Sequence, residues 1–135
     1  MRARDALGRR VPADSPAAVE PVSEEALPPL AAVACARELL RRGRAFSAHE
    51  IFEAIWKAGP AAERDLWQGL AQLCVGLTHV QRGNRVGAVT LLRRGAGHLH
   101  AQVPRYGLEP PRLICEALAL ADAIEAGAPA PELRI

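Results

Sequence analysis

Apolar residues recur at helical spacing in five segments of the chain, which predicts five helices. The segments cover about 29–42, 45–58, 63–82, 85–100 and 110–125, and glycine or proline separates each from the next. Residues 1–26 show no periodicity and are predicted to form a disordered or loosely docked arm. The sequence therefore predicts an all-α fold, with a single helical domain over 27–127 and a tail over 128–135.

The third predicted helix, 63–82, is expected to lie at the centre of the fold. Its apolar stripe consists of Leu66, Leu70, Leu73, Leu77 and Val80. The opposite face carries no charge either, and a helix that is uncharged all round is typical of the protein interior. Gly69 and Gly76 leave a strip where another helix can approach closely.

A repeated pattern predicts that the helices stack as hairpins. Gly43 and Gly83 lie 40 residues apart, and each is followed five residues later by an alanine, Ala48 or Ala88. A large apolar residue, Phe52 or Leu92, lies four positions after each alanine. This resembles the second half of a tetratricopeptide-type repeat, whose period is about 34 residues. We expect stacked helical hairpins rather than an open solenoid.

Composition and charge exclude several classes of protein. The formal net charge of +2 is too small to indicate nucleic-acid binding, and no aromatic residues are interleaved with the basic ones. The longest uncharged segment, 66–81, is too short to span a bilayer. The three cysteines lie far apart without a Cys-x-x-Cys pair, which favours reduced core thiols. No signal-peptide pattern is visible, and we expect a cytoplasmic protein that has no membrane contact.

A group of polar and aromatic side chains on the second and third predicted helices, and on the turn after them, is the candidate ligand site. His49 and Glu53 share one edge of their helix beside Trp56, while Gln72 and His79 share the face of theirs that is opposite the leucines. Buried polar groups need partners, so we expect the two sets to meet across the helix interface. The candidate residues are His49, Glu50, Glu53, Trp56, Gln68, Gln72, His79 and Asn84.

Two interpretations of this group remain open: a ligand pocket, or a hydrogen-bond network that fixes how the hairpins pack. Glu50 has a structural alternative of its own. Ser47-x-x-Glu50 reads as a capping box at the start of the helix, with Phe46 and Ile51 as its hydrophobic staple.

A metal site is a further hypothesis. His49-Glu50-x-x-Glu53 resembles the zincin motif His-Glu-x-x-His, with glutamate in place of the second histidine. His49, Glu53 and His79 would hold a divalent metal, and Glu50 would act as the general base of a metal-dependent hydrolase.

Arginines flank both predicted hairpin turns and suggest an anion site. Arg42 and Arg44 lie at the first turn, and Arg82 and Arg85 at the second. If stacking brings the turns together, these side chains form a basic rim suited to an acidic peptide or a phosphate. The alternative is that both turns are simply solvated.

Linked motifs over residues 39–99 resemble the family called domain of unknown function 309. They are Ala-His-Glu-Ile-Phe-Glu-Ala-Ile-Trp over 48–56, the segment 63–72, and then His79 and Gly83-Asn84-x-x-Gly87-Ala88. The resemblance implies a small, all-helical bacterial or archaeal protein but no established activity. The family often has an aromatic residue near Ala45, which is small here. The matching motif positions are His49, Glu50, Glu53, Trp56, Gln68, Gly69, Gln72, His79, Gly83 and Asn84.

The function indicated by these features is a binding or scaffold module for a small ligand or a partner protein. The alternative is the metal-dependent hydrolase. Whether the protein is an enzyme, and whether it forms a homo-oligomer, both stay open at this point.

Overall fold

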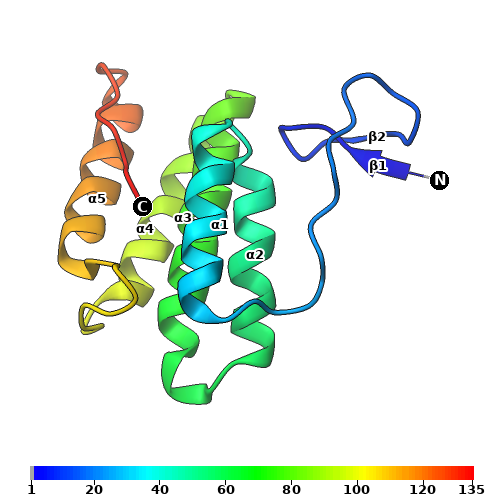
Figure 1. Ribbon diagram of the computed structural model, residues 1–135. Helices are drawn as coiled ribbons and strands as arrows, with labels where there is room; N and C mark the ends of the chain where they lie inside the picture. Colours follow the sequence, from blue (N-terminus) through cyan, green and yellow to red (C-terminus); the bar gives the residue numbers. More distant parts are fainter. Residues whose placement is uncertain (1) are drawn as a thin grey trace.

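Five α-helices make up most of the structure, a computed structural model that describes residues 2–135 (Figure 1). The all-α prediction is confirmed, and each predicted helix boundary lies within one residue of the observed one. A short 3-10 turn, η1, precedes α3. The helices are α1 (Pro29–Arg41), α2 (Ala45–Ala58), α3 (Arg64–Arg82), α4 (Arg85–Leu99) and α5 (Pro110–Ala126), with η1 at Ala61–Glu63.

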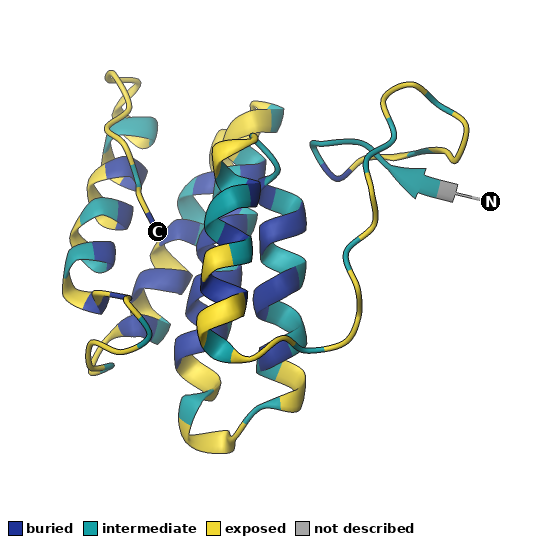
Figure 2. Ribbon diagram, viewed as in Figure 1, coloured by how far each residue is buried: buried dark blue, intermediate teal, exposed yellow. Residues whose placement is uncertain are grey.

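Helix α3 lies at the centre, with α2 packed on one side of it and α4 on the other. Helix α1 packs against α2, and α5 packs against α4, so that successive helices are neighbours. Figure 2 shows that the buried residues follow these inward faces. Leu66, Leu70 and Leu73 are fully buried, as predicted, whereas Leu77 is half-buried and Val80 is 39% exposed. The predicted apolar stripe therefore reaches the surface in the last turns of α3.

Glycines allow α3 and α4 to approach closely, which confirms the predicted contact strip. A Cβ atom at Gly69 would lie 3.1 Å from the carbonyl oxygen of Gly95, and one at Gly76 would lie 2.9 Å from Leu92. Gly95 occupies the facing position on α4, where a Cβ atom would lie 2.9 Å from the carbonyl oxygen of Gly69. Side chains at these positions would force the two helices apart.

The two glycine-led turns that suggested a repeat lie near each other in space. The side chain of Gln81 at the end of α3 donates a hydrogen bond of 2.8 Å to the carbonyl oxygen of Gly43 in the α1–α2 turn. Gly43 and Gly83 both have positive φ, at 72° and 75°, which glycine adopts without strain. The chain thus reverses direction in the same way at both turns. The specific likeness to tetratricopeptide repeats stays a prediction.

The N-terminal arm contains a small antiparallel hairpin of β1 (Arg2–Arg4) and β2 (Arg10–Pro12), which the helical periodicity did not indicate. Figure 1 shows the hairpin beside the helices, joined to α1 by an extended segment. Arg82 donates a hydrogen bond of 2.9 Å to the carbonyl oxygen of Leu7. Arg44 donates another, of 2.6 Å, to the carbonyl oxygen of Glu20. Both ends of the arm are thereby tied to the helices.

An aromatic column links α2, α3 and the loop before α5. The ring of Trp67 stacks against Phe52 at 6.0 Å and against Tyr106 at 5.6 Å between centroids. The carboxylate of Glu63 accepts hydrogen bonds from the Trp67 indole, at 3.2 Å, and from the Tyr106 hydroxyl, at 3.0 Å. The indole N–H of this fully buried tryptophan is thus satisfied.

Other sequence expectations differ from the structure in detail. Leu30, an apolar residue in the first turn of α1, is 67% exposed. All three cysteines are free, but only Cys74 is fully buried and Cys115 is exposed. The tail after α5 returns to the helices, where Ile135 is buried and its carbonyl oxygen accepts a hydrogen bond of 3.0 Å from Arg37. No helix within residues 2–135 is both long enough and apolar enough to cross a membrane.

Candidate functional site

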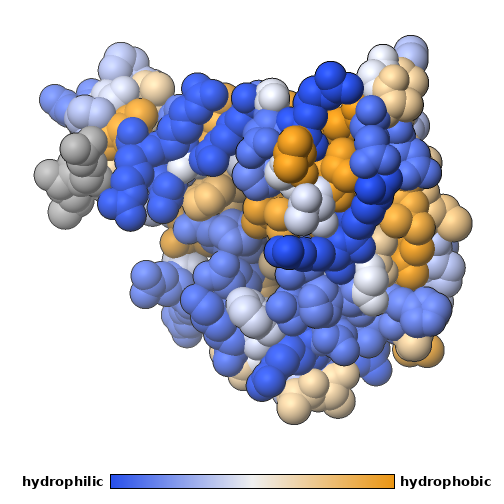
Figure 3. Space-filling view, turned by 180° about the vertical axis from the view of Figure 1, so that it is seen from behind, coloured by the Kyte–Doolittle hydropathy of each residue, from blue (hydrophilic) through white to orange (hydrophobic). Residues whose placement is uncertain are grey.

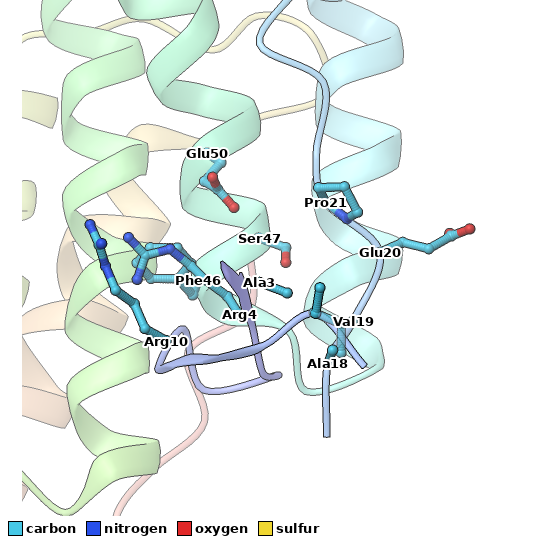
Figure 4. Close-up of a pocket in the computed structure, with 11 residues that line it drawn as sticks. Ala3, Arg4, Arg10, Ala18, Val19, Glu20, Pro21, Phe46, Ser47 and Glu50 are labelled. Atoms are coloured by element: carbon cyan, nitrogen blue, oxygen red, sulfur yellow. The ribbon is translucent and has the colours of Figure 1, made fainter. Parts of the chain in front are cut away.

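A hollow of about 660 Å³ lies between the N-terminal arm and the first half of α2 (Figure 4). We call it the arm hollow. Its wall is formed by both segments, and small apolar residues of the arm make up much of it. Its charged, polar and aromatic lining includes Arg4 and Arg10 from the arm, and Phe46, Ser47 and Glu50 from α2.

Helical spacing places Glu50 and Phe46 in the arm hollow. The inward stripe of α2 is occupied by Ala48, Ile51 and their neighbours, so that Phe46 and Glu50 lie towards the arm. The Phe46 ring closely contacts Gly8, where a Cβ atom would overlap it at 2.4 Å. The Arg4 guanidinium lies over the same ring at 4.7 Å from its centroid, a cation–π arrangement. Phe46 is therefore the main contact between the arm and α2.

Glu50 is half-buried, and no hydrogen bond to its carboxylate is formed by any of residues 3–135, the part of the chain whose side chains the structure describes. Burial raises the pKa of Glu50, and the negative charge of Glu53 adds to this rise. The nearby His49, Arg4 and Arg44 act in the opposite direction without cancelling it. The arm hollow thus holds a carboxylate that is partly desolvated and has no structural partner.

The capping-box interpretation of Glu50 is wrong. Helix α2 begins at Ala45, so its N-cap is Arg44 and Ser47 already lies within the helix. No side chain caps this N-terminus, and Ser47 Oγ instead accepts a hydrogen bond of 3.0 Å from Arg44. A capping box at Ser47 would start the helix three residues after its observed and predicted start at Ala45, and Glu50 has no role there.

We expect Glu50→Gln to stabilise the protein at neutral pH. Because the folded-state pKa of Glu50 is raised above its ordinary value of 4.5, its contribution to stability is fully present below that pH and is lost as the pH rises through the folded pKa. Glutamine has no proton to lose. The gain should be small, on the order of a few tenths of a kcal/mol, because solvent screens a half-exposed charge.

Thermal melts of the wild type and Glu50→Gln between pH 4 and pH 7 test this expectation. The two melting temperatures should coincide at the acid end and separate as the pH rises, with the variant higher. A variant that melts lower at pH 7 would show that Glu50 has a stabilising partner after all. Glu25→Gln, an exposed glutamate of the arm whose side chain takes part in no hydrogen bond or ion pair among the described residues, is the control.

The predicted α2 residues contact one another rather than α3. His49 Nε2 lies 2.8 Å from Glu53 Oε2, and Lys57 donates a hydrogen bond of 2.9 Å to Glu53 Oε1. His49 Nδ1 lies 3.0 Å from the carbonyl oxygen of Phe46. The hydrogen bond from Lys57, followed by that from His49, lowers the pKa of Glu53. Trp56 is half-buried and packs on the core.

The predicted α3 residues remain apart from this α2 group. Gln68 and Gln72 are half-buried, and Gln72 Oε1 is a buried acceptor without a partner among the described residues. His79 lies 3.2 Å from Asn84, and Asn84 accepts a hydrogen bond of 3.0 Å from the amide of Gly87, which caps α4. No hydrogen bond joins the two sets among the described residues, because His49 pairs with Glu53 and His79 pairs with Asn84, while Gln72 Oε1 stays without a partner.

The proposed metal ligands are likewise not brought together. Nowhere in residues 2–135 do three His, Cys, Asp or Glu side chains lie close enough to hold a metal ion. Glu53 is engaged by His49 and Lys57, while His79 pairs with Asn84 at the start of α4. The zincin-like spacing reflects an i, i+4 contact within one helix.

The arginines at the two turns contact backbone carbonyl groups rather than forming one basic rim. Arg44 and Arg82 bind the arm, and Arg85 donates a hydrogen bond of 2.8 Å to the carbonyl oxygen of Ile124 at the end of α5. Arg42 pairs with Glu38 at 3.4 Å on the surface. Figure 3 shows that the rear face is mainly hydrophilic, with a hydrophobic patch framed by hydrophilic side chains. The residues predicted to bind an anion thus have structural partners.

Sequence reasoning missed the arm residues of the hollow. Arg4 and Arg10 lie on strands of three residues each, too short to show an alternating pattern. The glycine at position 8 was the one sequence feature that could have indicated a close contact of the arm, because a residue without a side chain lets the arm approach Phe46. Phe46 was noticed, but as part of a helix cap.

The fold and the arm hollow define a small all-helical protein whose candidate site is shared between its helices and an N-terminal arm. Residues 33–91 match the family described as "Domain of unknown function (DUF309)", which confirms the resemblance for this segment. The chain is also 38% identical over 73 residues to the "Uncharacterized protein YpuF" of Bacillus subtilis (strain 168). That match covers 51% of this chain and 42% of the relative. No solved structure matches the chain.

The matched segment includes α2 and α3 but not the arm. Phe46, Ser47 and Glu50 therefore lie inside the matched segment, whereas Arg4 and Arg10 lie outside it. The arm hollow thus lies between a helix within the matched segment and an arm that the match does not include.

Proposed function

We propose that the protein is a binding module for a small ligand, which it holds in the arm hollow with Glu50 as the polar anchor. The observation that carries this proposal is the unpartnered, half-buried carboxylate of Glu50 in a hollow of about 660 Å³. Hollows of this size, lined mainly by apolar side chains with a few polar groups, are typical of small-molecule sites.

The physical argument is that burying a charge without a partner costs free energy. The neighbouring Glu53 shows the structural alternative, because it is paired with both His49 and Lys57. Glu50 lies on the same helix and has no such pair, so its carboxylate lowers stability at neutral pH. Residues that destabilise the free protein in this way are characteristic of functional sites.

The hydrolase alternative has less support, because His79 pairs with Asn84 and does not join His49 and Glu53, which contact each other. A binding role needs only the hollow and its polar anchor. It also agrees with the way in which Phe46 and the arm form a wall around that anchor.

A fragment screen by ¹⁵N–¹H NMR on the full chain tests the proposal. We expect fragments that carry an amine or another hydrogen-bond donor to shift the amides of Gly8, Phe46, Ser47 and Glu50 together. Glu50→Gln and Phe46→Ala should abolish these shifts, and Glu38→Gln should leave them unchanged. The proposal fails if no fragment shifts this group of amides, or if the shifts persist in both site variants.

A further inference from the structure

We infer that the ligand of the arm hollow is a zwitterion about the size of a dipeptide, with its carboxylate at Arg10 and its ammonium group at Glu50. This inference rests on the proposed function and adds the chemical class of the ligand. It follows from the charges, the walls and the volume of the hollow.

Arg10 and Glu50 are opposite charges that line one hollow without being paired. Among the described residues, neither side chain takes part in a hydrogen bond or an ion pair. Figure 4 shows Arg10 extending from the arm and Glu50 from α2, whereas Glu20 points away from the hollow. Two unpaired charges of opposite sign, held on different elements, suit a ligand that carries both complementary charges.

The two other arginines near the hollow, Arg4 and Arg44, already have partners. Arg4 donates a hydrogen bond of 2.7 Å to the carbonyl oxygen of Gly8 and lies over Phe46. Arg44 binds the carbonyl oxygen of Glu20 and the hydroxyl of Ser47. These contacts leave Arg10 to take a carboxylate and Glu50 to take an ammonium group, both by charge-assisted hydrogen bonds.

The walls between these charges are apolar and suit uncharged side chains. Ala18, Val19 and Pro21 line the hollow on the arm, and Phe46 lines it on α2. The volume of about 660 Å³ is larger than a single amino acid needs and falls within the range of sites that enclose small ligands. A dipeptide with two aliphatic side chains fits these walls and provides both terminal charges.

Isothermal titration calorimetry with three probes tests the inference on the full chain. The probes are Leu-Leu, its N-acetylated form, which lacks the ammonium group, and its C-terminal amide, which lacks the carboxylate. We expect Leu-Leu to bind and each capped form to bind about tenfold more weakly, because each loses one hydrogen bond to a charged group.

Single substitutions then assign each charge to its partner. Glu50→Gln should remove the preference for the free ammonium group while keeping that for the free carboxylate. Arg10→Gln should do the reverse. Arg9→Gln, an exposed neighbour in the arm that does not line the hollow, should bind all three probes like the wild type. Circular dichroism confirms that each variant keeps its helices.

The outcomes separate this inference from the proposed function. Equal binding of the free and capped dipeptides would overturn the zwitterion assignment while leaving a small-ligand site. So would a lack of binding by all three probes, if fragments still shift the amides of Phe46 and Glu50. Failure of both the dipeptides and the fragments would overturn the inference and the proposed function together.

Discussion

Replacing Trp67 with alanine is expected to lower the free energy of unfolding by about 3–5 kcal/mol. Trp67 is the largest fully buried side chain, and its ring stacks between Phe52 and Tyr106. Removing it leaves a cavity in the core and takes one hydrogen-bond donor from the Glu63 carboxylate. Urea denaturation followed by circular dichroism measures the loss.

Trp56 provides the matched control for this prediction. It is also a helical tryptophan, but it is half-buried at the edge of the core. Trp56→Ala should therefore cost clearly less than Trp67→Ala. Equal losses for the two variants would show that the aromatic column does not hold the helices together.

Replacing Gly95 with alanine is expected to lower the free energy of unfolding by about 1–3 kcal/mol through overpacking. The new Cβ atom would lie 2.7 Å from Leu73 Cδ2 and 2.9 Å from the backbone oxygen of Gly69. The leucine side chain can move, but the carbonyl oxygen belongs to a packed helix. Helices α3 and α4 would have to separate.

Gly97, two residues further along α4, should respond with the opposite sign. A Cβ atom there would meet nothing within 4 Å. Gly97→Ala should then stabilise the protein by about 0.5–1 kcal/mol, because glycine weakens a helix relative to alanine. Thermal melts of the two variants side by side check the pair, and a loss of stability in both would contradict the close crossing of α3 and α4.

Helical periodicity was sufficient to predict the helical part of the fold, but not the β1–β2 hairpin of the arm. It located all five helices, and the glycines of α3 indicated where α4 approaches. The period of a helix is fixed by backbone geometry, so it can be read from a single sequence. The end of the predicted apolar stripe of α3 was less accurate, since Val80 is exposed.

The candidate site was predicted only in part, for a physical reason. Spacing shows which residues share an edge of a helix, but not what lies opposite that edge. His49 and Glu53 do share an edge, yet they bind each other, and His79 binds Asn84. Glu50 was identified, but its surroundings come from the arm, whose strands are too short for a pattern to be read.

The two hydrogen bonds from the helices to the arm place few demands on the side chains of the arm. Arg44 and Arg82 bind carbonyl oxygens of the arm, which every amino acid provides. Apart from Gly8, which must stay small beside Phe46, the arm can accumulate substitutions without losing these attachments. Residues such as Arg10 can therefore diverge while the helices stay the same, so that relatives with identical helical cores could acquire different ligand preferences through the arm alone.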